Sequence, residues 1–285
     1  GGDNTVTNSG KVLATNGLSI RVGGAGNEVA LLEGSVLFGD VFFNSTDGTF
    51  SFGPGLNAVV QLDNLIPDTI IAPNDAAVVD GNTIIAIDST GFVAADQGVA
   101  ELGSQILAAL DRLGPRAAAP EVTQGSANAD GSFTWGGAIG GLATGGETDT
   151  TAGYASLNGG IIGGHTFGGD NGVFLGLTAS RQESDSSFEQ DTGTLFAGVQ
   201  GGWQMGGLDV KASLTAGGSS TDQTRIVANN TVAGPVMGIE EVEASYNTAF
   251  VMPAITFSGN MDRGSDSFTP SLRLRYGKIM QDGYA

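Results

Sequence analysis

The sequence lacks most of the residues that build catalytic, metal and disulfide sites. Its 285 residues include no cysteine and one histidine, His165. Disulfides, thiolate metal sites, a cysteine nucleophile and a paired-histidine metal site are therefore excluded. The acidic group Asp185, Glu189 and Asp191 is expected in a long loop, as solvated surface. His165 is typical of a strand end. We expect no enzymatic activity, no metal and no cofactor.

Basic residues and long apolar runs are also scarce. Eleven Lys and Arg residues stand against 30 Asp and Glu residues, which gives a net charge of −19. Binding to nucleic acid requires Lys and Arg clusters that neutralise phosphates, so nucleic acid is not an expected partner. No run approaches the ~20 apolar residues of a membrane helix. The chain starts at Gly1 without an initiator Met or a signal peptide, so we expect an interior piece of a longer precursor.

Glycine is abundant, with 48 residues against a usual share of ~7%. No collagen-like triplet accompanies it, and 40% hydrophobic with 14% charged residues is compatible with a folded chain. The residue pattern changes twice along the sequence. We therefore divide it into residues 1–90, 91–130 and 131–285.

Residues 1–90 consist of short β-type runs separated by Gly, Asn and Asp. Their spacing of roughly 10 to 15 residues suits a sandwich or the rungs of a β-solenoid. The phrase from Asp3 to Gly10 resembles one rung of a parallel β-helix, with Val6 inward. We expect the end of a right-handed parallel β-solenoid, closed by an irregular cap that includes Ile66-Pro67-Asp68. The expected runs are Asn4–Asn8, Leu18–Val22, Val29–Leu32, Ser35–Phe43, Thr49–Phe52, Ala58–Leu62, Ala76–Val79 and Thr83–Ile87.

Residues 92–113 change to helical spacing, with apolar side chains at offsets of 3, 4, 4 and 3. Gly114-Pro115 ends the pattern. From Asp96 to Leu113 the helix would be about 27 Å long, close to the ~30 Å of a bilayer core. Gly98 and Gly103 are poor helix formers, which indicates a close neighbour. The expected packing stripe is Val99, Leu102, Ile106, Leu110 and Leu113.

Residues 131–285 form a series of segments in which apolar and polar residues alternate. Apolar residues outside and polar residues inside are typical of a barrel wall in an outer membrane. The expected strands are 132–143, 152–166, 172–183, 191–204, 207–219, 244–258 and 266–279. Their connections alternate between compact turns and longer polar loops, of which Ser220–Glu243 is the longest. A sandwich gives no reason for this alternation.

The strand pattern also predicts which side chains lie on each face. The rows expected to face lipid are Phe133, Trp135 and Ile139; Ala155, Leu157 and Ile161; Val173, Leu175 and Leu177; and Leu195, Ala197, Val199 and Trp203. The charged residues expected in the lumen are Asp209, Lys211, Arg273 and Arg275. There they would pair across strands or face the helix, or simply line a wet interior.

A solenoid, one helix and a barrel, in this order, resemble the C-terminal part of a type V autotransporter. The phrase from Asp88 to Asp96 is similar to the family's junction between passenger and linker helix. Trp135-Gly136-Gly137 resembles its first barrel strand, and Thr224-Arg225 falls where the family tends to place an Arg. The stretch from Phe268 to Tyr276, followed by Asp282-Gly283-Tyr284, is similar to its "TPxxxLxY…DGY" strand.

The resemblance implies a fold, a location and partners. The fold is mainly β: a solenoid end, a linker helix and about 7 strands of an expected ~12-stranded antiparallel outer-membrane barrel. The barrel would export and anchor its own N-terminal passenger at the surface of a Gram-negative bacterium. Its partners would be outer-membrane lipid, the barrel-assembly machinery, periplasmic chaperones and its own passenger domain.

The sequence also departs from the family. An odd, open set of strands leaves unpaired edges that hydrocarbon does not tolerate, and the terminal aromatic strand is missing. We therefore expect a fragment cut at both ends, which by itself secretes nothing. Residues 92–113 contain no Asn, so self-cleavage is not expected. An alternative is a surface β-solenoid adhesin or polysaccharide-binding module without a barrel. A porin is disfavoured by the solenoid and the helix.

Overall fold

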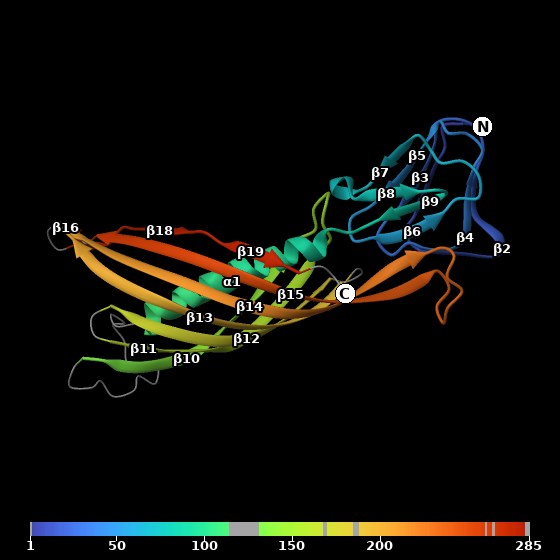
Figure 1. Cartoon of the computed structure of the whole chain (residues 1–285). Coiled ribbons are helices and arrows are strands. Elements are labelled where there is room, and N and C mark those ends of the chain that lie inside the picture. Colours follow the sequence, from blue (N-terminus) through green and yellow to red (C-terminus); the bar gives the residue numbers. More distant parts are fainter. Residues whose placement is uncertain are drawn as a thin grey trace.

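The computed structural model describes residues 2–113, 131–167, 170–184, 188–259, 261–263 and 266–282. The molecule is elongated, as Figure 1 shows. A small β structure formed by the first ninety residues lies at one end. A long, curved sheet formed by the second half of the chain makes up the rest, and a single helix connects the two parts.

Parallel strands confirm the expected β-solenoid. One face contains β1 (Thr5–Asn8), β3 (Asn27–Leu31), β5 (Gly48–Phe52) and β7 (Thr69–Ile71), each hydrogen-bonded in parallel to the next in this order. A second face pairs β2 (Lys11–Val22) with β4 (Val36–Phe43), also in parallel. Parallel pairing between strands one rung apart is the pattern of a solenoid. The sequence did not predict β7, which is only three residues long.

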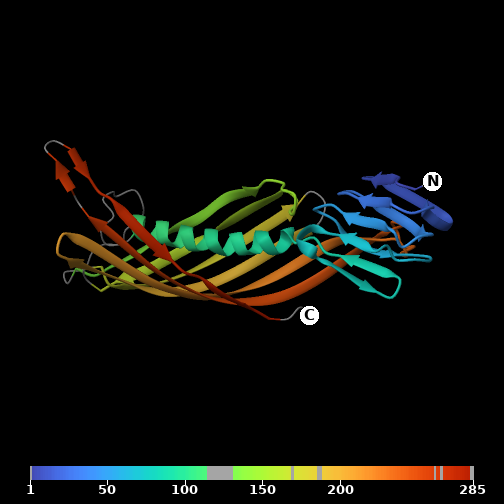
Figure 2. The ribbon, with the colours of Figure 1, turned by 90° about the horizontal axis from the view of Figure 1, so that it is seen from above.

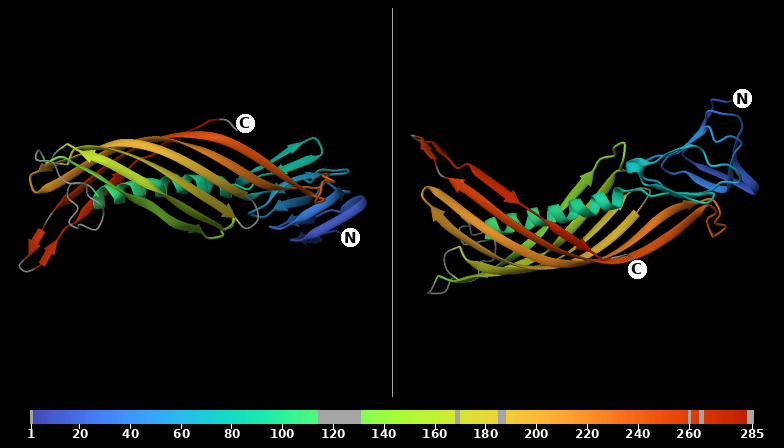
Figure 3. Two further views of the ribbon diagram at one scale, coloured as in Figure 1. Left: turned by 90° about the horizontal axis from the view of Figure 1, so that it is seen from below. Right: turned by 45° about the horizontal axis from the view of Figure 1, so that its top comes forward.

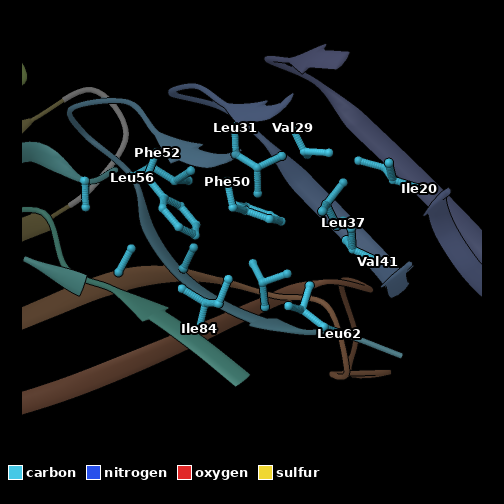
Figure 4. Close-up of a cluster of buried hydrophobic side chains, with 14 of the residues drawn as sticks. Ile20, Val29, Leu31, Leu37, Val41, Phe50, Phe52, Leu56, Leu62 and Ile84 are labelled. Carbon is cyan, nitrogen blue, oxygen red and sulfur yellow. The ribbon is translucent and has the colours of Figure 1, made fainter. Parts of the chain in front are cut away.

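The solenoid has an apolar core between its faces (Figure 4). Val29, Val41 and Phe50 are completely buried, because alternate residues of each strand point inward. Phe50 stacks on Phe52 with ring centroids 5.0 Å apart. Each such side chain contributes about 1.5–3 kcal/mol on burial, so a few rungs suffice for a stable unit.

Three short strands close the solenoid. The strand β9 (Thr83–Ala86) pairs antiparallel with both β6 (Asn57–Gln61) and β8 (Ala77–Asp80). A short 3₁₀ turn, η1 (Pro73–Asp75), directly precedes β8, and Asn74 there has a φ of 54°. Antiparallel pairing ends the parallel stack, as expected of a cap.

The helix α1 (Thr90–Leu113) begins six residues before the predicted start at Asp96. The Asp88 carboxylate accepts hydrogen bonds from the Thr90 backbone N–H at 3.2 Å and from the Thr90 hydroxyl at 2.7 Å. It thereby satisfies one of the free N–H groups at the helix start. Within the described part of the chain, no helix has the length and apolar character needed to cross a membrane.

The second half of the chain forms an antiparallel wall in which sequence neighbours pair. It consists of β10 (Phe133–Gly145), β11 (Tyr154–Thr166), β12 (Gly172–Ser184), β13 (Phe188–Met205), β14 (Leu208–Asn229) and β15 (Ile239–Gly259). The expected seventh strand is divided. Two segments, β18 (Ser271–Arg275) and β19 (Lys278–Gln281), pair with β15 on either side of an interruption at Gly277. A small hairpin, β16 (Met261–Arg263) with β17 (Asp266–Phe268), precedes them.

The two faces of the wall follow the predicted alternation, with one exception. Leu175, Leu214 and Leu274 are 46–62% exposed on the convex face, and Lys211 points to the opposite face. The exception is the first strand, whose predicted lipid-facing row of Phe133, Trp135 and Ile139 is wrong. Trp135 and Ile139 are buried against the helix, since the concave face of this strand is also apolar. The outward residues include Leu142, which is 79% exposed.

The strands on the solenoid side are longer than expected. Residues 184–190 and Ser220–Glu243 were predicted as loops, but β13 begins at Phe188, β14 runs to Asn229 and β15 begins at Ile239. These strand ends extend beyond the apolar part of the wall and carry polar side chains on both faces. The sequence therefore has no alternating apolar pattern there that would predict a strand. As a result, β14 and β15 project toward the solenoid (Figure 1).

The wall is an open, curved sheet, a partial β-barrel, and α1 lies along its concave side. Figure 2 shows the helix in the trough of the sheet, and both views of Figure 3 show the same arrangement. The predicted order of solenoid, helix and partial barrel is confirmed. The helix starts beside the solenoid, whereas β10 starts at the far end of the trough.

Candidate functional site

The contact between α1 and the concave wall is apolar along its middle. Leu102, Ile106 and Leu110 are buried, and Val99 is partly buried. The side chain of Leu113, the last member of the predicted stripe, lies outside the described residues. The stripe meets inward side chains of five wall strands, which are Trp135, Ile139, Ile162, Phe174, Phe196, Phe250 and Met252. Alternate residues along each strand supply this surface, so the wall is shaped to hold a helix.

Glycines allow the helix and the wall to approach closely. A Cβ atom at Gly98 would lie 2.8 Å from the Gln182 amide nitrogen, and one at Gly103 would lie 3.0 Å from the Met252 sulfur. On the wall, a Cβ at Gly141 would lie 3.0 Å from a Glu101 carboxylate oxygen. Gly in a helix costs up to about 1 kcal/mol relative to Ala, and here it permits close packing.

Basic side chains of the wall contact the middle and the C-terminal end of α1. The Lys211 ammonium lies 3.5 Å from the Asp111 carboxylate, and the Arg273 guanidinium donates to the same carboxylate. The Arg275 guanidinium donates to the Ala100 carbonyl at 2.8 Å and the Ser104 hydroxyl at 2.6 Å. Three of the predicted lumen residues therefore meet the helix.

The fourth predicted lumen residue, Asp209, has a different partner. Its carboxylate accepts a hydrogen bond from the Gln204 amide at 3.0 Å, near the turn between β13 and β14. The sequence analysis did not single out Asp111, the shared partner of Lys211 and Arg273. Its position next to the apolar stripe, at Leu110, was the available signal.

A row of glutamines crosses the wall near the N-terminal end of α1. Gln223 donates to Gln190 and Gln190 donates to Gln182, each at 3.3 Å, and Gln182 donates to the Ala94 carbonyl of α1 at 3.0 Å. The phenol of Tyr246 also donates to Gln190, at 3.3 Å. These buried amides are linked into one hydrogen-bonded network, so their desolvation is compensated. The sequence pattern does not predict this network, because these strand ends carry polar residues on both faces.

The junction between solenoid and helix is fixed to the wall. The Ala152 backbone N–H donates to the Thr90 hydroxyl at 2.8 Å, and the Asp88 backbone N–H donates to the Asn57 side chain at 3.0 Å. The Arg225 guanidinium lies 4.8 Å from the ring centroid of Phe92 and donates to the Asp88 carbonyl at 3.4 Å. One short segment thus contacts the solenoid, β14 and the loop that precedes β11.

The C-terminal end of β14 pairs with β6 in the cap of the solenoid. Val227 to Asn229 lie parallel to Asn57 to Val59 of β6, so that wall and cap form one 11-stranded sheet. The side chain of Asn230 is 2% exposed and makes hydrogen bonds to the backbone of two strands. It accepts from the Gln61 N–H at 2.8 Å and donates to the carbonyls of Gln61, at 2.9 Å, and Gly39, at 3.1 Å.

The remaining candidate side chains lie apart from the helix. His165 Nδ1 is 3.1 Å from the Thr134 hydroxyl at the end of β11. Glu189 and Asp191 lie in β13 and not in a loop, and Glu189 pairs with Arg181 at 2.5 Å. Asp185 lies outside the described residues. Among those described, no group of three or more His, Cys, Asp or Glu side chains could hold a metal ion.

The wall is antiparallel and its convex face is apolar. Its concave face carries polar and basic residues and holds a helix. This is the architecture of an outer-membrane β-barrel with a helix in its lumen. The family model described as Autotransporter beta-domain matches residues 134–285, more than half of the chain. The chain belongs to this family, which places it in type V secretion as a translocator in the outer membrane of Gram-negative bacteria, with its own passenger. No curated protein and no solved structure matches the chain.

Proposed function

We propose that the protein exports its own N-terminal region through the barrel and anchors it at the cell surface. The path of the chain carries this proposal. Residues 1–90 lie at one end of the trough, α1 runs along the trough, and β10 begins at the opposite end. This path is expected if the barrel inserts into the membrane from the periplasm and residues 1–90 pass outward through its pore.

The lengths of the strands and turns support the orientation. Barrels of this type keep short turns on the periplasmic side and longer extensions outside. Here the turn between β13 and β14 lies at the end far from the solenoid and consists of Gly206 and Gly207. The long ends of β14 and β15 lie at the solenoid end. In our proposal the solenoid is therefore extracellular.

Antiparallel pairing argues against the alternative function. A solenoid adhesin or polysaccharide-binding module without a barrel would continue parallel rungs of constant length. Instead, the strands from β10 to β15 pair antiparallel with their sequence neighbours. We propose that the barrel-assembly machinery and periplasmic chaperones deliver the protein to its membrane, and we assign it no catalytic activity.

Two epitope tags test the orientation in the full-length protein on intact cells. One tag follows Gly81 in the β8–β9 turn, and the other lies between Gly206 and Gly207. All three glycines have open space around the position of a side chain, so both turns should accept an insertion. We expect antibody to label the Gly81 tag on intact cells, and the Gly206 tag only after the outer membrane is opened. Labelling of the Gly206 tag alone would contradict the export function.

A further inference from the structure

Positive charge gathers on the concave face of the wall, along the stretch that faces α1. Lys211 and Arg225 lie on β14, and Arg273 and Arg275 on β18. Each of the four makes a polar contact with α1 or with the segment that leads into it. Asp209 shares this face but bonds to Gln204 at the strand end.

The convex face of the same wall has the opposite charge balance beyond its apolar part. Its exposed charged residues on β12, β13 and β14 include one base, Arg181, and the acids Glu183, Glu189, Asp191 and Asp222. Arg181 is bound to its acidic neighbours Glu189, at 2.5 Å, and Glu183, at 3.7 Å. The two faces therefore carry charges of opposite sign.

Polar cavities lie between α1 and the wall. One, of about 40 Å³, is lined by Asp111, Asp170, Lys211, Ser213 and Arg273. A second, of about 80 Å³, lies nearer the outer end of the helix beside Gln182 and Gln190. A water molecule needs only ~10–15 Å³ by this measure, so both cavities can hold water. The side chains of Lys211 and Arg273 are each 38% exposed, so ions in solution can reach them.

Asp111 is the helix residue that compensates Lys211 and Arg273. When α1 leaves, the cations keep their places on the wall but lose this carboxylate. Of the charged residues that line the first cavity, Lys211, Arg273 and Asp170 then remain, which gives a net positive charge. A net charge on the wall of a narrow pore raises the local concentration of the opposite ion. Rings of Arg and Lys are a known basis of anion selectivity.

We propose that the wall formed by β14 and β18 makes the lumen attract anions, so that the pore conducts anions in preference to cations once α1 is displaced. The proposal rests on the membrane barrel of the proposed function, but not on the direction of export. The composition of the chain that occupies the trough agrees with it. Residues 90–113, which occupy the trough, contain three acids and one base, and residues 1–90, which would have passed through the pore, contain ten acids and two bases.

Conductance in planar bilayers tests the proposal. The full-length protein carries Ile106→Asp, which places a charge in the buried helix contact and displaces α1. Under a KCl gradient we expect a reversal potential that shows preference for chloride over potassium. The added changes K211Q, R273Q and R275Q should remove this preference. The matched control R181Q removes a base from the convex face and should leave the preference unchanged. A pore without preference, or one that prefers potassium, would overturn the proposal.

A second measurement decides the matter if the variant forms no channels. Because the chain has no cysteine, a single Ser213→Cys change in an Asp111→Asn background reports the potential beside Lys211 when the helix carboxylate no longer compensates it. We expect an anionic methanethiosulfonate to react faster than a cationic one, relative to a free thiol. Ser219→Cys lies on the same face of β14, about 26 Å along the strand from Lys211. This is beyond the ~10 Å Debye length, so this position should show no such bias. Equal rate ratios at the two positions would refute the proposal.

The two accounts can fail separately. Failure of the proposed function would appear as absent surface labelling of the Gly81 tag. Failure of the anion preference would leave that labelling intact and remove only the bias in conductance and thiol reactivity. The same set of variants supports both measurements.

Discussion

The carboxylate of Asp111, near the C-terminal end of α1, lies 3.5 Å from the ammonium of Lys211 on β14. Arg273 binds the same carboxylate from β18. This contact joins the helix to two strands that lie far along the sequence. It fixes the helix both along and around its axis, because the carboxylate is held from two directions.

A double-mutant cycle measures this contact. Asp111→Asn and Lys211→Gln should each lower the free energy of unfolding in detergent, and the double variant should lower it by less than the sum. The side chains are 42% and 38% exposed, so solvent screens the pair and the coupling should be about 0.5–1 kcal/mol. Strictly additive effects would show that the ion pair contributes nothing.

Truncation of the buried stripe should cost more. Ile106 is 1% exposed, and Ile106→Ala leaves a cavity between helix and wall. We expect a loss of about 2–5 kcal/mol in the free energy of unfolding, measured by heat or urea. Gln97→Ala at an exposed position of the same helix is the control and should cost less than about 1 kcal/mol. Similar losses for the two variants would contradict the docking described here.

Asn230→Ala should loosen the solenoid end from the wall. The change leaves the partly buried N–H and carbonyl of Gln61 without their side-chain partner, whereas the Gly39 carbonyl keeps the Ser19 hydroxyl. An unsatisfied buried group costs about 1–3 kcal/mol, so protease cleavage between residues 57 and 86 should accelerate at least about fivefold. Asn229→Ala removes only exposed contacts to Thr231 and Glu240 and serves as the control. Equal cleavage rates would contradict the prediction.

The sequence predicted those elements that have a regular apolar pattern. Leu214 and Lys211 lie an odd number of residues apart, so a half-apolar strand puts them on opposite faces, as observed. The solenoid runs and the stripe of Leu102, Ile106 and Leu110 were found for the same reason. In each case one face is buried, and burial imposes a period of two or of about 3.6.

Where both faces have similar polarity, the sequence was less informative. The alternating pattern predicts that Trp135 and Ile139 face lipid, because it does not indicate that the apolar stripe of α1 packs on this strand. The extensions of β13 to β15 looked like loops, since Gln190 and Gln223 are polar. Their burial depends on pairing with each other, which is a contact between distant strands.

Cross-linking of surface-exposed molecules tests the central claim that the helix occupies the lumen of the barrel that displays its passenger. The full-length protein carries the Gly81 tag and cysteines at Glu101 and Gly141, whose side-chain positions meet across the helix and β10. The control pair joins Glu101→Cys with Leu142→Cys, the next residue, which is 79% exposed on the convex face. Molecules captured by antibody on intact cells are treated with a short bis-maleimide. We predict cross-linking of the 101–141 pair and not of the 101–142 pair. Captured molecules without the 101–141 cross-link would contradict the account.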